Sequence, residues 1–341
     1  MRKSLTKMVI FGLLLLSMVV SCSKKEAAAP AEKEVITLVA ASMFDSTHPF
    51  NKCYEKFGEL VNEYQDEVVI DLQISESKAL GVETDFFRFM SQGESVDIAI
   101  LAPGNISKRI PSIAIVDMPL IFKSVEHRNK VLASEHFAPI AQEAIDKGNI
   151  RIIGFAGGAS RSIISNYAIT DMDTLQGFKL RVMGAPIWAK VFDSVGAVPS
   201  VIAYDEVYSA VQTGVIQGLE NEKVGFSSMR FFEVAPHYTM NEHAITVRPL
   251  FISESTFKKL SPTVQAAVLK AGKEAGEYGS QYELDMADAE LAKLVDAGLA
   301  YAHEFSDEDK AEFRRRATPA LMEFVEENGF TDLYNAIQSV E

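Results

Sequence analysis

Cysteine is almost absent from this 341-residue chain, and its scarcity excludes several classes of protein. Only Cys22 and Cys53 occur, which excludes a disulfide framework and any zinc site built from several cysteines. Basic residues are also outnumbered, because 33 Lys and Arg stand against 47 Asp and Glu, a formal charge of −14. Since an acidic field of this size repels phosphate backbones, nucleic acid is not an expected partner.

The motifs of common enzyme classes are missing as well. The chain contains no G-x-S-x-G, the signature of an esterase nucleophile. It has no P-loop and no G-x-G-x-x-G, since Gly154, Gly157 and Gly158 have the wrong spacing. It also lacks H-E-x-x-H, and His237 and His243, six residues apart, are poorly spaced for a metal. We therefore expect no catalytic residues, no cofactor and no metal.

The composition that is present is that of a folded globular protein. Apolar residues make up 48% of the chain and charged residues 23%. The length is that of about two domains. Once the amino-terminal cysteine is set aside, Cys53 has no partner for an internal disulfide, and we expect it to be a buried thiol.

The amino-terminal segment predicts a secretion signal. Basic residues at Arg2, Lys3 and Lys7 precede an apolar run from Met8 to Val20. This run is too short to span a bilayer comfortably, which takes about 20 residues. It ends in Val-Val-Ser-Cys at Cys22, which resembles the lipobox of bacterial lipoproteins.

The lipobox predicts that residues 1–21 are removed and that Cys22 is acylated. An ordinary signal peptide followed by a chance cysteine is the alternative. The next residues, 22–34, are rich in Lys, Ala and Glu and read as a flexible tether. A cysteine, a tether and then a folded domain is the arrangement that a lipid-anchored secreted protein needs.

The remaining chain alternates between strand and helix patterns, which favours an α/β fold with mostly parallel sheets. Short apolar, β-branched runs predict strands, at 35–41, 68–74, 96–101, 151–155, 179–183, 198–202, 216–220 and 245–252. Helical spacing of apolar residues predicts helices, at 49–64, 84–92, 125–147, 186–195 and 205–213. Ser261-Pro262 then opens a helical region in which 274–294 reads as one long helix.

One stretch, from Gly177 to Asn221, is specific. It contains GFKLRV, DEVY, VQTG and GLEN, and further pieces outside it read DIA, DMPLIF and LSP. In this order and spacing they resemble the substrate-binding subunits of TRAP transporters, the tripartite ATP-independent periplasmic uptake systems. The resemblance covers roughly residues 35–335.

The resemblance implies a two-lobe periplasmic binding protein fold, type II-like, with hinge strands and a long bracing carboxy-terminal helix. Lobe I would comprise 35–157 and about 247–285. Lobe II would comprise 158–246 and about 286–335.

The resemblance also implies a ligand site. In the family, the arginine of the K-L-R-V strand binds the ligand carboxylate, and here that residue is Arg181. The chemistry fits, because a planar guanidinium can donate two parallel hydrogen bonds to a carboxylate. A surface arginine is the alternative. The other candidates are Arg161, Asn221, Tyr204, Trp188 and Phe44, and for Trp188 core packing is equally open.

Three departures from the family pattern bear on the ligand. Family members often carry Q-E-N-P where this chain has Leu219 to Glu222. Leu101-Ala102-Pro103 stands where sugar-acid binders have a polar pair, and Phe44 is large and apolar. These changes favour a carboxylate with a less polar body over a richly hydroxylated ligand such as sialic acid.

Together these observations predict a lipid-anchored periplasmic solute receptor that captures an organic acid and delivers it to TRAP membrane permease subunits. A receptor of an ATP-driven importer with a similar two-lobe fold is one alternative. A hydrolase on an α/β scaffold and an adhesin or structural lipoprotein are two others.

Overall fold

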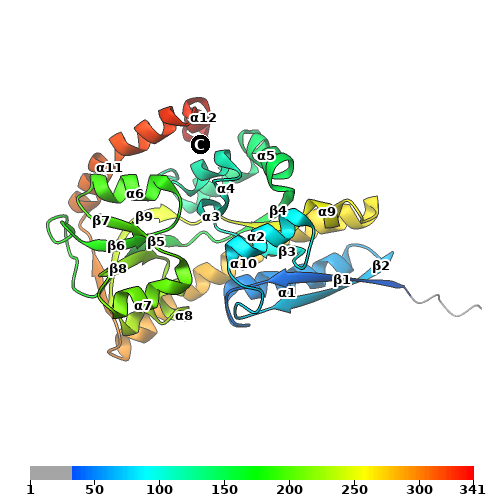
Figure 1. Cartoon of the computed structure of the whole chain (residues 1–341), viewed down its shortest axis with the longest axis horizontal. Coiled ribbons are helices and arrows are strands. Elements are labelled where there is room, and N and C mark those ends of the chain that lie inside the picture. Colours follow the sequence, from blue (N-terminus) through cyan, green and yellow to red (C-terminus); the bar gives the residue numbers. More distant parts are fainter. Residues whose placement is uncertain (1–32) are drawn as a thin grey trace, which may run out of the picture. The chain divides into compact units, whose positions relative to one another are not determined.

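The structure is a computed structural model, and it describes residues 33–341 (Figure 1). Within these residues the strands form two separate sheets. The predicted signal peptide and Cys22 lie outside the described residues, as does nearly all of the tether. The first sheet has five strands, in the spatial order β2 (Val68–Ser75), β1 (Glu34–Ala41), β3 (Ile98–Ile100), β10 (Arg248–Ser253) and β4 (Ile150–Ala156).

The second sheet has six strands and carries most of the specific sequence pattern. Its spatial order is β11 (Tyr301–Glu304), β9 (His237–Ile245), β5 (Ser160–Ser165), β8 (Gly218–Asn221), β6 (Lys179–Val182) and β7 (Val198–Val201). Within it β6 runs parallel to β7 and β8, with Arg181 opposite Leu219 of β8. The predicted α/β class is therefore confirmed. The sheets are mixed rather than mostly parallel, because β10 pairs antiparallel with β3 and β4, and β5 pairs antiparallel with β8 and β9.

Helices cover both sheets. Those that accompany the first sheet or its connections are α1 (Pro49–Glu63), α2 (Glu83–Gln92), α3 (Pro103–Ile106), η1 (Pro111–Asp117), α4 (Val125–Ala133), η2 (Glu135–Phe137), α5 (Ala138–Gly148) and α9 (Glu254–Phe257). Those inserted between strands of the second sheet are α6 (Pro186–Ser194), η3 (Tyr204–Glu206), α7 (Val207–Gln212), α8 (Lys223–Ser228) and η4 (Phe231–Glu233). The chain ends with α11 (Asp307–Glu327) and α12 (Thr331–Ser339).

Three segments connect the sheets. The chain passes from β4 to β5 through Gly157 and Gly158, whose φ angles of 77° and 126° favour glycine. It returns from β9 to β10 through Thr246 and Val247. The two crossings bind each other, since the Gly158 amide donates to the Thr246 hydroxyl at 2.7 Å. The third connection is α10.

The predicted long helix is present as α10, which spans Pro262–Asp296 and is longer than its expected core of 274–294. The hydroxyl of Ser261 accepts from the amide of Val264 and caps the helix, as the Ser-Pro pair indicated. In Figure 1 this helix, coloured yellow to orange, runs from the strands of the first sheet to those of the second.

Two sequence expectations about elements were wrong. The helix predicted over 125–147 is divided, because α4 ends at its cap residue Ser134 and η2 separates it from α5, which has Pro139 in its first turn. The strand predicted over 245–252 is split between β9 and β10, which belong to different sheets. The lobe boundaries given above stay a prediction.

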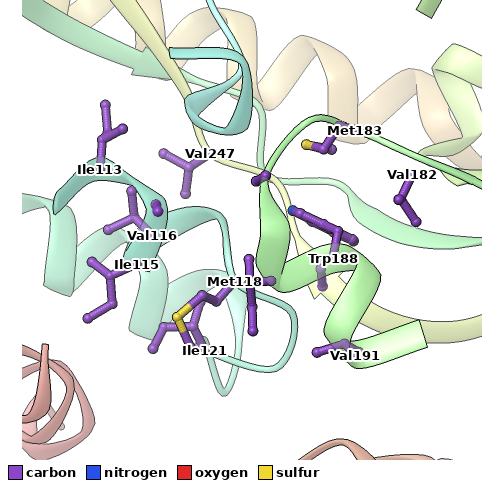
Figure 2. Packing of buried hydrophobic residues seen from close by; sticks show 14 of the residues in the cluster. Ile113, Ile115, Val116, Met118, Ile121, Val182, Met183, Trp188, Val191 and Val247 are labelled. Atoms are coloured by element: carbon purple, nitrogen blue, oxygen red, sulfur yellow. The ribbon is translucent and has the colours of Figure 1, made fainter. Parts of the chain in front are cut away.

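Apolar packing joins the two halves. One buried cluster includes Val116 and Met118 before α4, Val247 in the crossing, and Val182 and Trp188 from the second sheet and α6. Figure 2 shows these side chains close to one another, with Trp188 projecting from α6 toward the segment that carries Met118. Cys53 is a buried free thiol on α1, as expected, and burial raises its pKa to about 12.

Candidate functional site

A cavity of about 310 Å³ lies where loops of the first sheet meet strand ends of the second. This volume is at the lower end of the range for small-molecule sites. On the side of the first sheet, the cavity is lined by residues that follow β1 and β3 and by residues at the starts of α1, α2 and β10. From the second come residues of β5 and at the carboxyl ends of β6, β7 and β8, which is where α/β sheets place ligands.

Arg181, near the end of β6, points its guanidinium into this cavity. Only 4% of the residue is exposed, and burial lowers its pKa from the ordinary value. Its Nε donates to the carbonyl of Ile202 at 2.9 Å, which fixes the plane of the group. The guanidinium also lies over the ring of Tyr204, 5.3 Å from its centroid. Within residues 33–341 no carboxylate forms an ion pair with it.

Arg161, on β5, is held quite differently, within a buried cluster of charges. Its Nε and Nη2 bind the carboxylate of Glu220 at 2.5 and 2.9 Å, and Nη2 also donates to the Glu220 carbonyl. Its Nη1 donates to Glu222 at 2.7 Å. Burial opposes the charge of Arg161, but the two carboxylates outweigh it and raise the pKa. Four of the five N–H donors of Arg161 are therefore used by the protein itself.

His243 of β9 extends this cluster away from the cavity. Its Nε2 lies 3.3 Å from Glu220, and its Nδ1 lies 3.0 Å from the side-chain oxygen of Asn241. Burial would raise the pKa of Glu220, but Arg161 and His243 lower it to about 2. Burial lowers the pKa of His243, although the Glu220 carboxylate acts against this shift. Glu220 thus stays ionised as the internal counter-charge of Arg161.

Asn221 and Tyr204 form one wall. The Asn221 amide nitrogen donates to the hydroxyl of Tyr204 at 2.7 Å, and the Asn221 carbonyl accepts from Tyr238 at 3.1 Å. Gly225, one turn into α8, leaves the room that the Asn221 side chain occupies, because a Cβ there would collide with its amide. Asn221 is thereby fixed with its side chain beside the cavity.

The opposite wall comes from the first sheet and is partly aromatic. Phe44, after β1, stacks on His48 with ring centroids 3.8 Å apart. His48 accepts from the Phe50 amide and caps α1, and burial lowers its pKa to about 3, so its ring is neutral. Glu83 at the start of α2 adds a carboxylate whose Oε2 accepts from the Ala102 amide and the Asn105 side chain, both at 2.8 Å.

Five of the six predicted binding residues line this one cavity, and they are Phe44, Arg161, Arg181, Tyr204 and Asn221. Trp188 does not line it. Its side chain is fully buried, and its indole nitrogen lies 3.3 Å from Asp117. The ring also contacts the Arg161 guanidinium from behind, at 5.5 Å. The structure therefore places Trp188 in the core, the second of the two readings left open by the sequence.

Sequence reasoning missed four charged residues of the cavity. One of them, Asp205, was quoted only as part of the D-E-V-Y motif. Arg248 stands at the first position of β10, in a run that reads as continuous apolar strand. Glu83 carries no motif apart from its place before a helix. Glu222 was noted only as a departure from the family pattern, although its contact with Arg161 could have been sought from the need to pair a buried arginine.

The arrangement can bind a small anion. Arg181 presents unused guanidinium donors to this cavity, whose lining also offers the polar side chains of Asn221 and Tyr204. Across residues 33–341, no three His, Cys, Asp or Glu side chains gather as a metal site. In the same part of the chain, no helix combines the length and apolarity needed to cross a bilayer.

Comparison with known proteins agrees with this geometry. A solute-binding protein of Sulfitobacter sp. (strain NAS-14.1) is 43% identical over 312 residues, covering 91% of this chain and 93% of that protein. A crystal structure of a TRAP periplasmic solute-binding protein from Sulfitobacter sp. NAS-14.1, with bound alpha-D-taluronate, matches with a TM-score of 0.83 and 43% identity. It covers 89% of this chain and 97% of that one.

A second solved structure is similar at lower identity. It is a TRAP periplasmic solute-binding protein of Roseobacter denitrificans with bound beta-D-glucuronate. It is 28% identical with a TM-score of 0.83, and the match covers 90% of this chain and all of the other. Residues 40–328 match the model of the bacterial extracellular solute-binding protein family 7. The chain belongs to this family of periplasmic transport receptors.

Proposed function

We propose that this protein captures a hydroxylated sugar acid in the periplasm and passes it to TRAP membrane permease subunits. The single observation that carries the proposal is Arg181, a buried guanidinium that faces the cavity without an ionic partner among the described residues. A buried unpaired charge is costly, and a ligand carboxylate supplies the missing partner. The alternatives of an ATP-driven importer and a hydrolase gain no support from the family match.

The polar body of the ligand is proposed from the cavity walls. Glu83, Asn105, Asn221 and Tyr204 offer acceptors and donors that suit hydroxyl groups. The two relatives described above hold taluronate and glucuronate, both of them hydroxylated. These observations favour a uronate-like acid. The departures at Phe44 and at residues 101–103 instead predict a ligand with a less polar body.

Binding measurements test this function directly. Native mass spectrometry of freshly purified protein should show a bound acid, and isothermal titration should then give saturable binding of D-taluronate, D-galacturonate or D-glucuronate. A protein that binds none of these, and that co-purifies with no carboxylic acid, would contradict the proposal.

Lipid anchoring through Cys22 is part of the proposal and rests on the sequence alone. The lipobox predicts that Cys22→Ser leaves the precursor unprocessed and without lipid. Growth of the host cells with a clickable fatty acid should label the parental protein and not the variant. Cys53→Ser is the matched control, because that thiol is buried in α1 and should not change the label. Equal labelling of Cys22→Ser and the parent would refute the anchor.

A further inference from the structure

Three arginines line the cavity, and they differ in how far the protein already satisfies them. Arg161 is matched in charge by Glu220 and Glu222, and four of its N–H groups are bound. Arg181 has no carboxylate partner within the described residues, and its one side-chain hydrogen bond there goes to a carbonyl. Most of its N–H groups are therefore unused. Arg161 therefore acts mainly as a support for the site, and Arg181 is free to bind an anion.

Arg248 belongs to neither class. It is the first residue of β10 and stands at the crossing between the sheets, with 6% of its surface exposed. Its Nη2 lies 3.8 Å from Glu222, an ion pair that is longer than a hydrogen bond. Its one side-chain hydrogen bond within the described residues runs from Nη1 to the Val247 carbonyl at 3.2 Å. Its charge is thus partly balanced while most of its donors remain unused.

One contact and one nearby charge bear on this side chain. Its aliphatic stem lies against Gly157 of the other crossing, where a Cβ would come within 2.9 Å of the Arg248 Cγ. Helix α10 contributes Glu283, a buried carboxylate whose Oε2 has no hydrogen-bond partner among the described residues and whose charge interacts with that of Arg248. Burial and the charge of Glu222 raise the pKa of Glu283 to about 7, although Arg248 and Arg128 act against this rise. Ionised Glu283 adds a second negative charge near Arg248.

We propose that Arg248 is a ligand-binding residue that donates hydrogen bonds to uncharged oxygens of the sugar acid, while Arg181 binds the carboxylate. This inference rests on the proposed function. The reason for the division is electrostatic. An arginine whose charge is partly balanced gains less from an anion but can still donate from a rigid, planar fork. An arginine without a counter-charge gains most from a carboxylate.

The test compares an acid with its uncharged amide. We would use whichever of D-taluronate, D-galacturonate and D-glucuronate binds the parental protein most tightly, together with its amide, which keeps the hydroxyls and removes the charge. Arg248→Lys retains the positive charge and loses the fork. It should weaken both ligands in parallel, by roughly tenfold to a hundredfold, the loss of one or two hydrogen bonds from a charged donor. Arg181→Gln should weaken the acid far more than the amide.

A second variant keeps the inference testable if Arg248→Lys does not fold. Glu283→Gln retains the shape of the side chain and removes a negative charge near Arg248. At pH 8, where Glu283 is ionised in the parent, this variant should shift the preference a few-fold toward the acid. Melting temperatures of the ligand-free variants report on folding separately.

The outcomes are separable. If Arg248→Lys leaves both affinities unchanged, or weakens only the acid, Arg248 does not read uncharged oxygens and this inference is overturned. An unchanged acid-to-amide preference in Glu283→Gln would contradict it as well. A parent that binds no sugar acid at all would instead contradict the proposed function, and this inference would fall with it.

Discussion

Arg181→Lys is expected to weaken binding of the ligand acid by roughly tenfold to several hundredfold. Lysine keeps the positive charge but cannot donate two parallel hydrogen bonds to one carboxylate. A hydrogen bond to a charged group contributes about 1.5–3 kcal/mol, and 1.4 kcal/mol is a factor of ten in affinity. Arg181→Ala should weaken binding further, because the ligand carboxylate would then be buried without a partner.

The measurement is isothermal titration with the acid that binds the parent, accompanied by melting curves of the ligand-free proteins. Arg230→Lys is the matched control, since Arg230 is exposed and pairs only with Glu233 on the surface. It should leave the affinity unchanged. The ligand-free Arg181→Lys protein should melt close to the parent, because Arg181 has no ionic partner to lose in the described residues. Parental affinity in Arg181→Lys would mean that the carboxylate clamp is assigned to the wrong residue.

Arg181, Tyr204 and Asn221 could be found from the sequence because the motifs around them resemble those of the TRAP family. A strand of four residues such as β6 has few alternative registers, so the face on which Arg181 lies follows from its apolar neighbours. The motifs K-L-R-V and G-L-E-N then mark two strands that turn out to be neighbours in the sheet. Strand alternation by itself indicates only the face of Arg181, whereas the choice of Tyr204 and Asn221 came from the family resemblance.

Trp188 and Arg248 could not be placed in this way. Trp188 lies on α6, two residues after the proline that begins the helix. Its indole nitrogen donates a hydrogen bond to Asp117, which is 71 residues earlier in the chain, and local sequence does not predict such a contact. Arg248 lies just after the point where the chain leaves one sheet for the other. Such a crossing has no periodicity of its own, so the apolar residues on both sides of it read as one strand.

The same limit applies to α10. The sequence predicts a long helix. It does not predict that glycines of this helix pack directly against the main chain of a strand. In the structure, a Cβ on Gly272 would come within 2.6 Å of the Ile153 carbonyl, and one on Gly276 would come within 2.6 Å of the Phe155 amide. Helix α10 therefore packs against β4 at a distance that only glycine permits.

Gly276→Ala is consequently expected to destabilise the protein, although alanine favours a helix over glycine by about 1 kcal/mol. The three atoms nearest to the new Cβ, at 2.6 to 2.9 Å, all belong to the Phe155 main chain, which cannot rotate away as a side chain could. Overpacking of this kind costs about 1–3 kcal/mol and occasionally more. Because the clash is with a strand backbone, we expect the upper end of that range and a net loss of about 2 kcal/mol. The melting temperature should fall by about 3 °C.

Gly184→Ala is the control for the melting temperature alone, since no atom lies within 4 Å of its added Cβ and Gly184 is exposed, although it lines the cavity. Its melting temperature should stay near that of the parent. Gly276→Ala should also weaken ligand binding, because Glu283 lies seven residues further along α10, two turns on the same face, and moves with the helix. A variant that melts at or above the parental temperature would show that α10 can leave β4 at little cost. The helix would then not be what holds Glu283 behind Arg248.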